Sequence, residues 1–173
     1  MARLTCWPQV KSALLTTTGL LLSTAVLATG CGGSDKMRVT LTDDRCTYEG
    51  DTTPAPGIFN IQVENKTSHF AIFTMWALPA GKNLEDVQHA FEQARPAFEQ
   101  GKEPKPGPFE GLFASGAADA RTGPDETSVM PVNESSGRFV IGCWVHTSAD
   151  ALSSEHPPPP AAVHVVPAEL KVQ

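Results

Sequence analysis

Short segments in which hydrophobic and polar residues alternate predict that this chain is mostly β-sheet. Val39 and Leu41 are each followed by a polar residue, and residues 58–64 continue the alternation. A period of two places alternate side chains on one face of a half-buried strand. Residues 70–78 are apolar at nearly every position, which is typical of a strand buried on both faces. Further strands are predicted at residues 127–132, 137–145 and 161–166.

The pattern changes to a helical period after residue 83. Asn83 is suited to be an N-cap, with Asp86 three residues later as its capping-box partner. Pro96 is expected to break or kink the helix, so that it stops near Ala94 and restarts for one turn. We expect the apolar stripe of this helix to pack against the sheet. Its members lie three or four positions apart: Leu84, Val87, Phe91, Ala94 and Phe98.

Segments rich in proline and glycine separate the predicted elements. Residues 102–108 contain three prolines, and residues 109–126 are rich in glycine and alanine, so we expect a long loop there. Four consecutive prolines at 157–160 are expected to form a stiff connector before the last strand. Six or seven short strands with one inserted helix favour a β-sandwich.

The first thirty residues are typical of an export signal. Arg3 and Lys11, without any acidic residue, precede an apolar run over residues 13–29. Small residues then lead into Cys31, which resembles the signal of bacterial lipoproteins, in which that cysteine is lipidated and becomes the new N-terminus. Two alternatives remain open. One is cleavage near Ala28 without lipidation, and the other is a retained helix, although the run is shorter than the ~20 apolar residues of a membrane span.

These features divide the chain into three parts. Residues 1–30 form the signal peptide, residues 31–36 a lipidated tether, and residues 37–173 a single domain large enough to bury a core. We expect the domain to lie in the cell envelope outside the cytoplasm, attached to a membrane through its N-terminal lipid. We expect it to be monomeric, and its protein partner in the envelope remains open.

The charge of the chain excludes one class of partner. The 173 residues carry 13 basic and 19 acidic side chains, a net charge of −6. Removal of residues 1–30 takes Arg3 and Lys11 and leaves 11 basic against 19 acidic residues. Nucleic-acid binding requires clustered Lys and Arg, so we do not expect it.

Two cysteines remain once Cys6 is removed with the signal and Cys31 is lipidated. Disulfides persist outside the cytoplasm, so Cys46 and Cys143 are expected to form one bridge. The alternatives are that these cysteines are metal ligands or free thiols. A bridge that closes so long a loop would stabilise the domain by ~4 kcal/mol in the chain-entropy model.

Several short motifs resemble the cupredoxins. The run Gly137–His146 contains a cysteine followed three residues later by a histidine, with the spacing of plastocyanin-type proteins, and Asn65-x₃-His69 resembles the segment that bears their first histidine ligand. Residues 78–86 resemble uncharacterised cupredoxin-like envelope proteins, and residues 43–47 resemble the cupredoxin domain of periplasmic iron-uptake proteins. The resemblance implies an all-β cupredoxin-like Greek-key sandwich, with an inserted helix and a long Pro/Gly-rich loop at about 79–131.

The resemblance also implies a candidate copper site. Its ligands would be Cys143, His69 and either His146 or His156, because thiolate and imidazole suit copper. The chain departs from the family in having no methionine after Cys143, and a bridge to Cys46 would remove the thiolate.

If both cysteines were instead reduced, Cys46, Cys143 and a histidine would make a soft Cu(I) site without a methionine. The remaining histidine of the last strand, His164, lies between Val163 and Val165. It is expected to face outward from its strand.

No motif for catalysis is found in the sequence. It contains no Gly-x-Ser-x-Gly elbow, no His-Glu-x-x-His and no phosphate-binding glycine loop. We therefore expect a non-enzymatic binding or structural module on a disulfide-stabilised, membrane-tethered domain, without a cofactor. The alternative is a copper-binding or electron-transfer protein that uses the site described above.

Overall fold

The computed structural model describes residues 36–105 and 107–173. The predicted signal peptide, the predicted lipidation site Cys31 and nearly all of the predicted tether lie outside these residues. Within the described part of the chain, no helix is long and apolar enough to cross a membrane.

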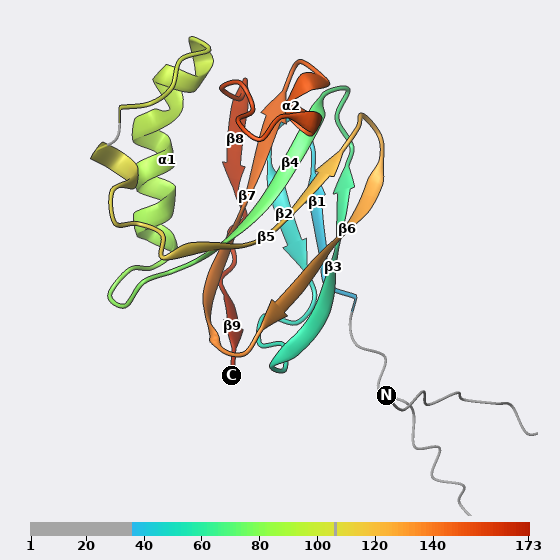
Figure 1. Cartoon of the computed structure of the whole chain (residues 1–173), viewed down its shortest axis with the longest axis vertical. Coiled ribbons are helices and arrows are strands. Elements are labelled where there is room, and N and C mark those ends of the chain that lie inside the picture. The colour runs from blue at the N-terminus through green and yellow to red at the C-terminus, as the bar shows by residue number, and fades with distance from the viewer. Residues whose placement is uncertain (1–35, 106) are drawn as a thin grey trace, which may run out of the picture. The chain divides into compact units, whose positions relative to one another are not determined.

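Two β-sheets form the body of the domain (Figure 1). The first sheet has the strand order β2-β1-β3-β6, and only its β1–β3 pair is parallel. The second has the order β5-β4-β7-β8, and β9 also pairs with β7. The strands of the first sheet are β1 (Arg38–Leu41), β2 (Cys46–Glu49), β3 (Gly57–Asn65) and β6 (Thr127–Glu134). Those of the second are β4 (Phe70–Ala77), β5 (Ser115–Thr122), β7 (Gly137–His146), β8 (Ala162–Val165) and β9 (Leu170–Val172).

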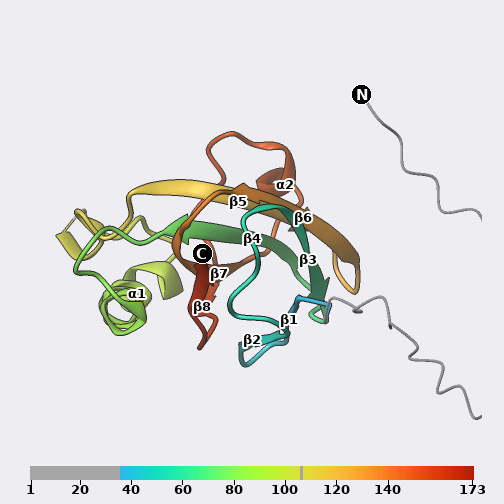
Figure 2. The same ribbon diagram turned by 90° about the horizontal axis from the view of Figure 1, so that it is seen from below.

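Three helical segments complete the domain: α1 (Leu84–Glu99), the 3₁₀-helix η1 (Gly107–Phe109) and α2 (Asp150–Ser153). Figures 1 and 2 both place α1 beside β8, at one edge of the second sheet. The predicted all-β sandwich with one inserted helix is therefore confirmed.

Strand β4 of the second sheet packs on both faces, as its apolar pattern predicts. In β4, Phe73 and Met75 face the space between the sheets and belong to the main core. Trp76 lies on the opposite face and packs in a second apolar cluster with α1, which includes Val87 and Phe91. The helix therefore covers part of the outer face of this sheet.

The predicted start of α1 is confirmed, but its predicted break is wrong. Asp86 N donates to Asn83 Oδ1 over 3.1 Å, and Asn83 N donates to Asp86 Oδ2 over 2.9 Å, which completes the capping box. The helix continues through Pro96 to Glu99. The turn after the proline is retained because Phe98 is buried, with its ring 6.0 Å from that of Trp144.

The glycine- and alanine-rich segment is not entirely a loop. Residues 115–122 form β5, which pairs with β4 over most of its length. Strand β6 follows and pairs with β3 in the first sheet. Within the segment 79–131, the part that stands apart from the two sheets therefore ends at residue 114.

Candidate functional site

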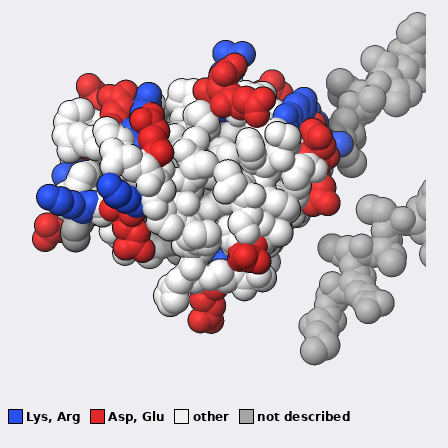
Figure 3. All heavy atoms as spheres, turned by 90° about the horizontal axis from the view of Figure 1, so that it is seen from above, with Lys and Arg blue, Asp and Glu red and all other residues white. Residues whose placement is uncertain are grey.

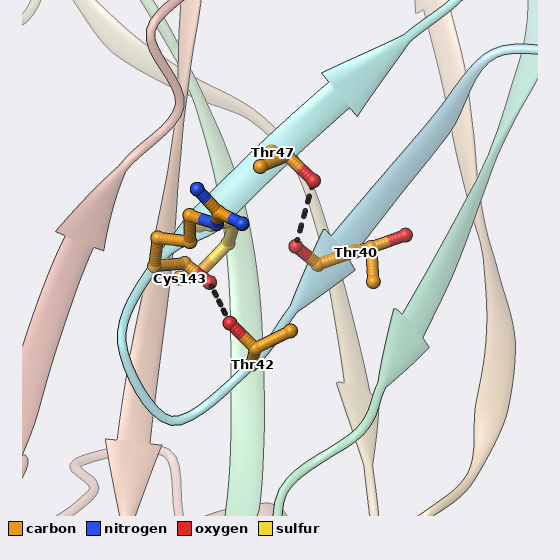
Figure 4. Close-up of a disulfide and its surroundings, with 6 residues drawn as sticks. Thr40, Thr42, Thr47 and Cys143 are labelled. Atoms are coloured by element: carbon orange, nitrogen blue, oxygen red, sulfur yellow. Dashed lines mark hydrogen bonds between the residues drawn. A yellow bond between two sulfur atoms is a disulfide. The ribbon is translucent and has the colours of Figure 1, made fainter.

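The two cysteines of the domain join the two sheets. Cys46 begins β2, Cys143 lies in β7, and their sulfur atoms form a disulfide across 97 positions of sequence with a Cα–Cα distance of 6.3 Å. Both residues are buried. Figure 4 shows the bridge beside the β1–β2 hairpin, where Thr47 Oγ1 donates to the Thr40 carbonyl over 3.4 Å. The predicted bridge is confirmed.

The structure separates Cys143 from the predicted copper ligand His69. Cys143 lies opposite Phe73 in the β4–β7 ladder, four residues along β4 from His69. At ~3.3 Å per residue, this is about 13 Å along the strand. His69 is exposed, and its main-chain oxygen accepts a hydrogen bond of 2.7 Å from Asn65 Nδ2.

The other two predicted ligands, His146 and His156, lie in different parts of the fold. His146 is buried at the end of β7, opposite Phe70, whereas His156 is exposed in the connector after α2. Among the residues that the structure describes, no three His, Cys, Asp or Glu side chains are grouped closely enough to hold a metal ion. With its sulfur bonded to Cys46, Cys143 has no thiolate, so these residues do not fit a copper centre in the disulfide form.

A pocket of about 530 Å³ lies on the outer face of the second sheet. Three neighbouring strands form its floor, because alternate residues of β5, β4 and β7 face the same side. Ile72 in the middle strand lies opposite Arg121 on one side and Trp144 on the other. The remaining floor residues are Thr74, Trp76, Asp119 and His146.

The walls of this pocket are mostly apolar. Phe98 comes from the end of α1, Pro104 from the loop after it and Phe109 from η1, while residues 157–160 supply four prolines. The stiff connector predicted from these prolines therefore encloses a pocket, a role that the sequence did not suggest. Figure 3 shows the end of the domain that carries α2, where uncharged surface lies between charged groups at the rim.

Two tryptophans meet on the pocket floor at a right angle. The rings of Trp76 and Trp144 have centroids 5.6 Å apart and planes inclined by 79°. Trp76 lies across Gly142 of the neighbouring strand, where a Cβ atom would be only 2.5 Å from its ring. Glycine at this position therefore allows the indole to lie close to the sheet.

Arg121 holds one wall of the pocket in place. Its Nη1 donates to the main-chain oxygens of Leu152 over 2.8 Å and Ser154 over 3.0 Å, at the end of α2. Its Nε lies 3.5 Å from Asp119 Oδ2. Arg121 thereby fixes the segment that leads from α2 into the prolines.

His146 contributes a neutral imidazole to the pocket floor. Its burial, together with the nearby positive charge of Arg121, lowers the pKa of its side chain. Its Nδ1 is shielded from water and has no hydrogen-bond partner. The ring therefore adds a polar but uncharged surface.

Sequence reasoning missed the contribution of β5 to this pocket. Asp119 and Arg121 alternate with the buried Ala120 and Thr122. This alternation indicates a strand with a polar outer face. The indication is weak because most other residues of β5 are small.

Comparison with known proteins gives only distant similarity. No protein-family model matches the chain, and no curated protein matches it. It is similar to the solved structure of reduced auracyanin from Roseiflexus castenholzii, at 14% identity and a TM-score of 0.37 over 78% of this chain and 97% of that one. It is also similar to auracyanin A, a blue copper protein from Chloroflexus aurantiacus, at 13% identity and a TM-score of 0.39 over 80% of this chain and 98% of that one. Auracyanin B matches at 11% identity and a TM-score of 0.34 over 79% of this chain and 86% of that one.

Proposed function

We propose that this domain is a non-enzymatic binding module that holds a small apolar or aromatic ligand in the pocket on the second sheet. The observation that carries this proposal is the lining of the pocket: two indoles, two phenyl rings and five prolines converge with a few polar groups. A concave, mainly apolar site of ~300–1,000 Å³ with few polar groups is typical of small-molecule binding.

Tryptophan fluorescence tests this proposal directly. The sequence holds three tryptophans, of which Trp7 belongs to the predicted signal peptide, while Trp76 and Trp144 both line the pocket. We expect the fluorescent probe anilinonaphthalene sulfonate to bind saturably at one site and to quench both indoles by energy transfer.

Two variants locate the probe. Thr74→Phe fills the pocket floor and is expected to abolish binding. Thr127→Phe adds the same ring on the exposed side of β6 in the other sheet and is expected to leave binding unchanged. Non-saturable binding, or equal binding to both variants, would contradict the proposal.

The location of the module is part of the proposal and is supported by the sequence alone. The predicted lipid on Cys31 would attach the domain to a membrane, so that its pocket samples ligands or a protein partner in the envelope. Mass spectrometry of the purified protein should detect a diacylated or triacylated N-terminal cysteine. A mature chain that begins elsewhere would contradict the attachment.

Copper binding or electron transfer is the alternative function. The disulfide form does not support it at His69, Cys143, His146 and His156, for the geometric reasons given above. Titration of the protein with Cu(II) distinguishes the two functions. An intense thiolate-to-copper absorption band would favour the alternative over the binding module.

A further inference from the structure

Two large apolar side chains are exposed on the outer face of the first sheet. Ile58 at the start of β3 is 80% exposed, and Val129 in β6 is 53% exposed. Both point away from the core, because Ile61 and Met130, which occupy the opposite parity on these strands, are buried in it. Pro131 is exposed on the same face, two positions along β6 from Val129. The domain therefore leaves an apolar surface uncovered on this sheet.

This apolar surface borders the point where the chain enters the domain. Ile58 and Val129 line a hollow of about 600 Å³ together with Lys36 and Met37, the first two residues that the structure describes. The Met37 carbonyl accepts a hydrogen bond of 2.9 Å from the main-chain nitrogen of Gln62 in β3. Figures 1 and 2 both show the start of the described chain beside β3. The hollow thus lies where the predicted tether joins the domain.

The length of the predicted tether limits how far this hollow can be from a membrane. Lys36 lies five positions after Cys31, the predicted site of lipidation. Five residues span at most ~17 Å even when the chain is fully extended. A lipid on Cys31 would hold that residue at the surface of the bilayer. Lys36 and the hollow that it lines would then stay close to the lipid headgroups.

The charge of the hollow is compatible with a phospholipid surface. The whole chain has a net charge of −6, yet Lys36 is the only charged residue among the described residues that line the hollow. The one carboxylate of β3, that of Glu64, lies 3.4 Å from Lys66 Nζ, which offsets its charge. Headgroup phosphates attract lysine, and apolar side chains partition into the boundary between headgroups and acyl chains. This face offers both kinds of contact.

We propose that the outer face of the first sheet docks on the membrane surface, with Ile58 and Val129 inserted among the lipids and Lys36 beside a headgroup phosphate. This inference rests on the part of the proposed function that attaches the domain to a membrane through Cys31. The ligand pocket lies on the outer face of the second sheet, which is the other side of the sandwich. Docking therefore fixes the orientation of the domain and leaves the pocket open to the envelope.

Quenching by brominated lipids tests the docking. The mature lipidated protein is reconstituted in vesicles of phosphatidylglycerol and a phosphatidylcholine that is brominated in the upper part of its acyl chains. In Ile58→Trp, the added indole should lose about half of its fluorescence, because inserted side chains reach ~5–10 Å into the boundary between headgroups and acyl chains. Gln93→Trp adds an indole at an exposed position of α1 and should not be quenched. The wild-type protein, with Trp76 and Trp144 in the pocket, supplies the background signal.

A second pair of variants tests the contribution of charge. In the Ile58→Trp protein, Lys36→Glu should reduce the quenching in these vesicles, because the new carboxylate is repelled by anionic headgroups. Lys171→Glu makes the same change at an exposed position of β9 in the second sheet and should leave the quenching unchanged. Equal effects of the two substitutions would contradict the placement of Lys36 beside a headgroup.

Sedimentation with the vesicles separates the ways in which the proposal can fail. If Ile58→Trp sediments with the vesicles but its added indole is not quenched, the docking is overturned and the attachment stands. If that unquenched indole is also blue-shifted, a protein and not the bilayer covers this face. A protein that does not sediment would overturn both the attachment and the docking. None of these outcomes depends on the pocket, which is tested separately with anilinonaphthalene sulfonate.

Discussion

The side-chain amide of Asn65 donates a hydrogen bond of 2.7 Å to the main-chain oxygen of His69. The same nitrogen donates to the Gly123 carbonyl over 2.8 Å, and Asn65 Oδ1 accepts from the amide and hydroxyl of Thr67. Asn65 is only 1% exposed, so water cannot replace these bonds. The Asn65-x₃-His69 segment thus has a structural role in the described residues, in which Asn65 organises the turn between β3 and β4.

Asn65→Ala should lower the free energy of unfolding by about 2–4 kcal/mol, because it leaves several buried polar groups without partners. Urea denaturation measures this change. Asn60→Ala is the matched control, since Asn60 lies exposed on the same strand, and its effect should stay within about 0.5 kcal/mol. Equal effects of the two substitutions would contradict this role of Asn65.

The elements with strong periodicity could be predicted from the sequence. The alternation in β3, the apolar run of β4 and the capping box of α1 each indicate a local secondary structure, and each of these elements is present in the folded domain. The disulfide followed from the expected compartment and from the number of cysteines. These features depend on neighbours in sequence or on composition, which a single sequence displays.

The pocket and the position of His164 could not be predicted in this way. The pocket forms where β5, β4 and β7 lie side by side. The order of strands in a sheet cannot be inferred from the local pattern of residues in each strand. His164 is expected to face outward, but it lies opposite Cys143 of the main core, and residues opposite each other in an antiparallel pair extend to the same face. Only the register with Cys143 determines its face.

Replacement of both bridge cysteines by alanine should lower the free energy of unfolding by about 4–5 kcal/mol. The bridge closes a loop of 97 positions, and its removal returns that conformational freedom to the unfolded chain. Urea denaturation of Cys46→Ala/Cys143→Ala measures the loss, with thiol counting to confirm the bridge in the wild type. Two reactive thiols in the denatured, unreduced wild type would show that the bridge is absent.

Arg121→Ala should loosen the segment from α2 to the prolines. Three carbonyl oxygens at the end of this helix, those of Ala151, Leu152 and Ser154, lose their donor. Hydrogen exchange should become faster in residues 148–160 and the pocket should bind the fluorescent probe more weakly. Lys171→Ala removes an exposed positive charge elsewhere in the same sheet and is the control. Unchanged exchange in Arg121→Ala would contradict its role as an anchor.

His146 should make the domain less stable in mild acid. Its folded-state pKa lies below the unfolded value of about 6.5, so below pH 6.5 the unfolded chain takes up a proton that the folded chain does not. The free energy of unfolding should therefore fall as the pH decreases from 7 toward 5. His146→Gln should flatten this fall, whereas the exposed His156→Gln should not. Identical pH profiles for the two variants would contradict the assignment.

Gly142→Ala should disturb the pocket floor from within the sheet. The new Cβ would lie 2.5 Å from Trp76 Cζ3, closer than real contacts allow, so the indole must move. Overpacking of this kind costs about 1–3 kcal/mol, and a shifted Trp76 should change the near-ultraviolet circular dichroism of its pair with Trp144. Gly116→Ala is the matched control, because a Cβ there meets nothing within 4 Å. If both alanine variants keep the wild-type spectrum and stability, then Gly142 is not what allows Trp76 to lie against the sheet.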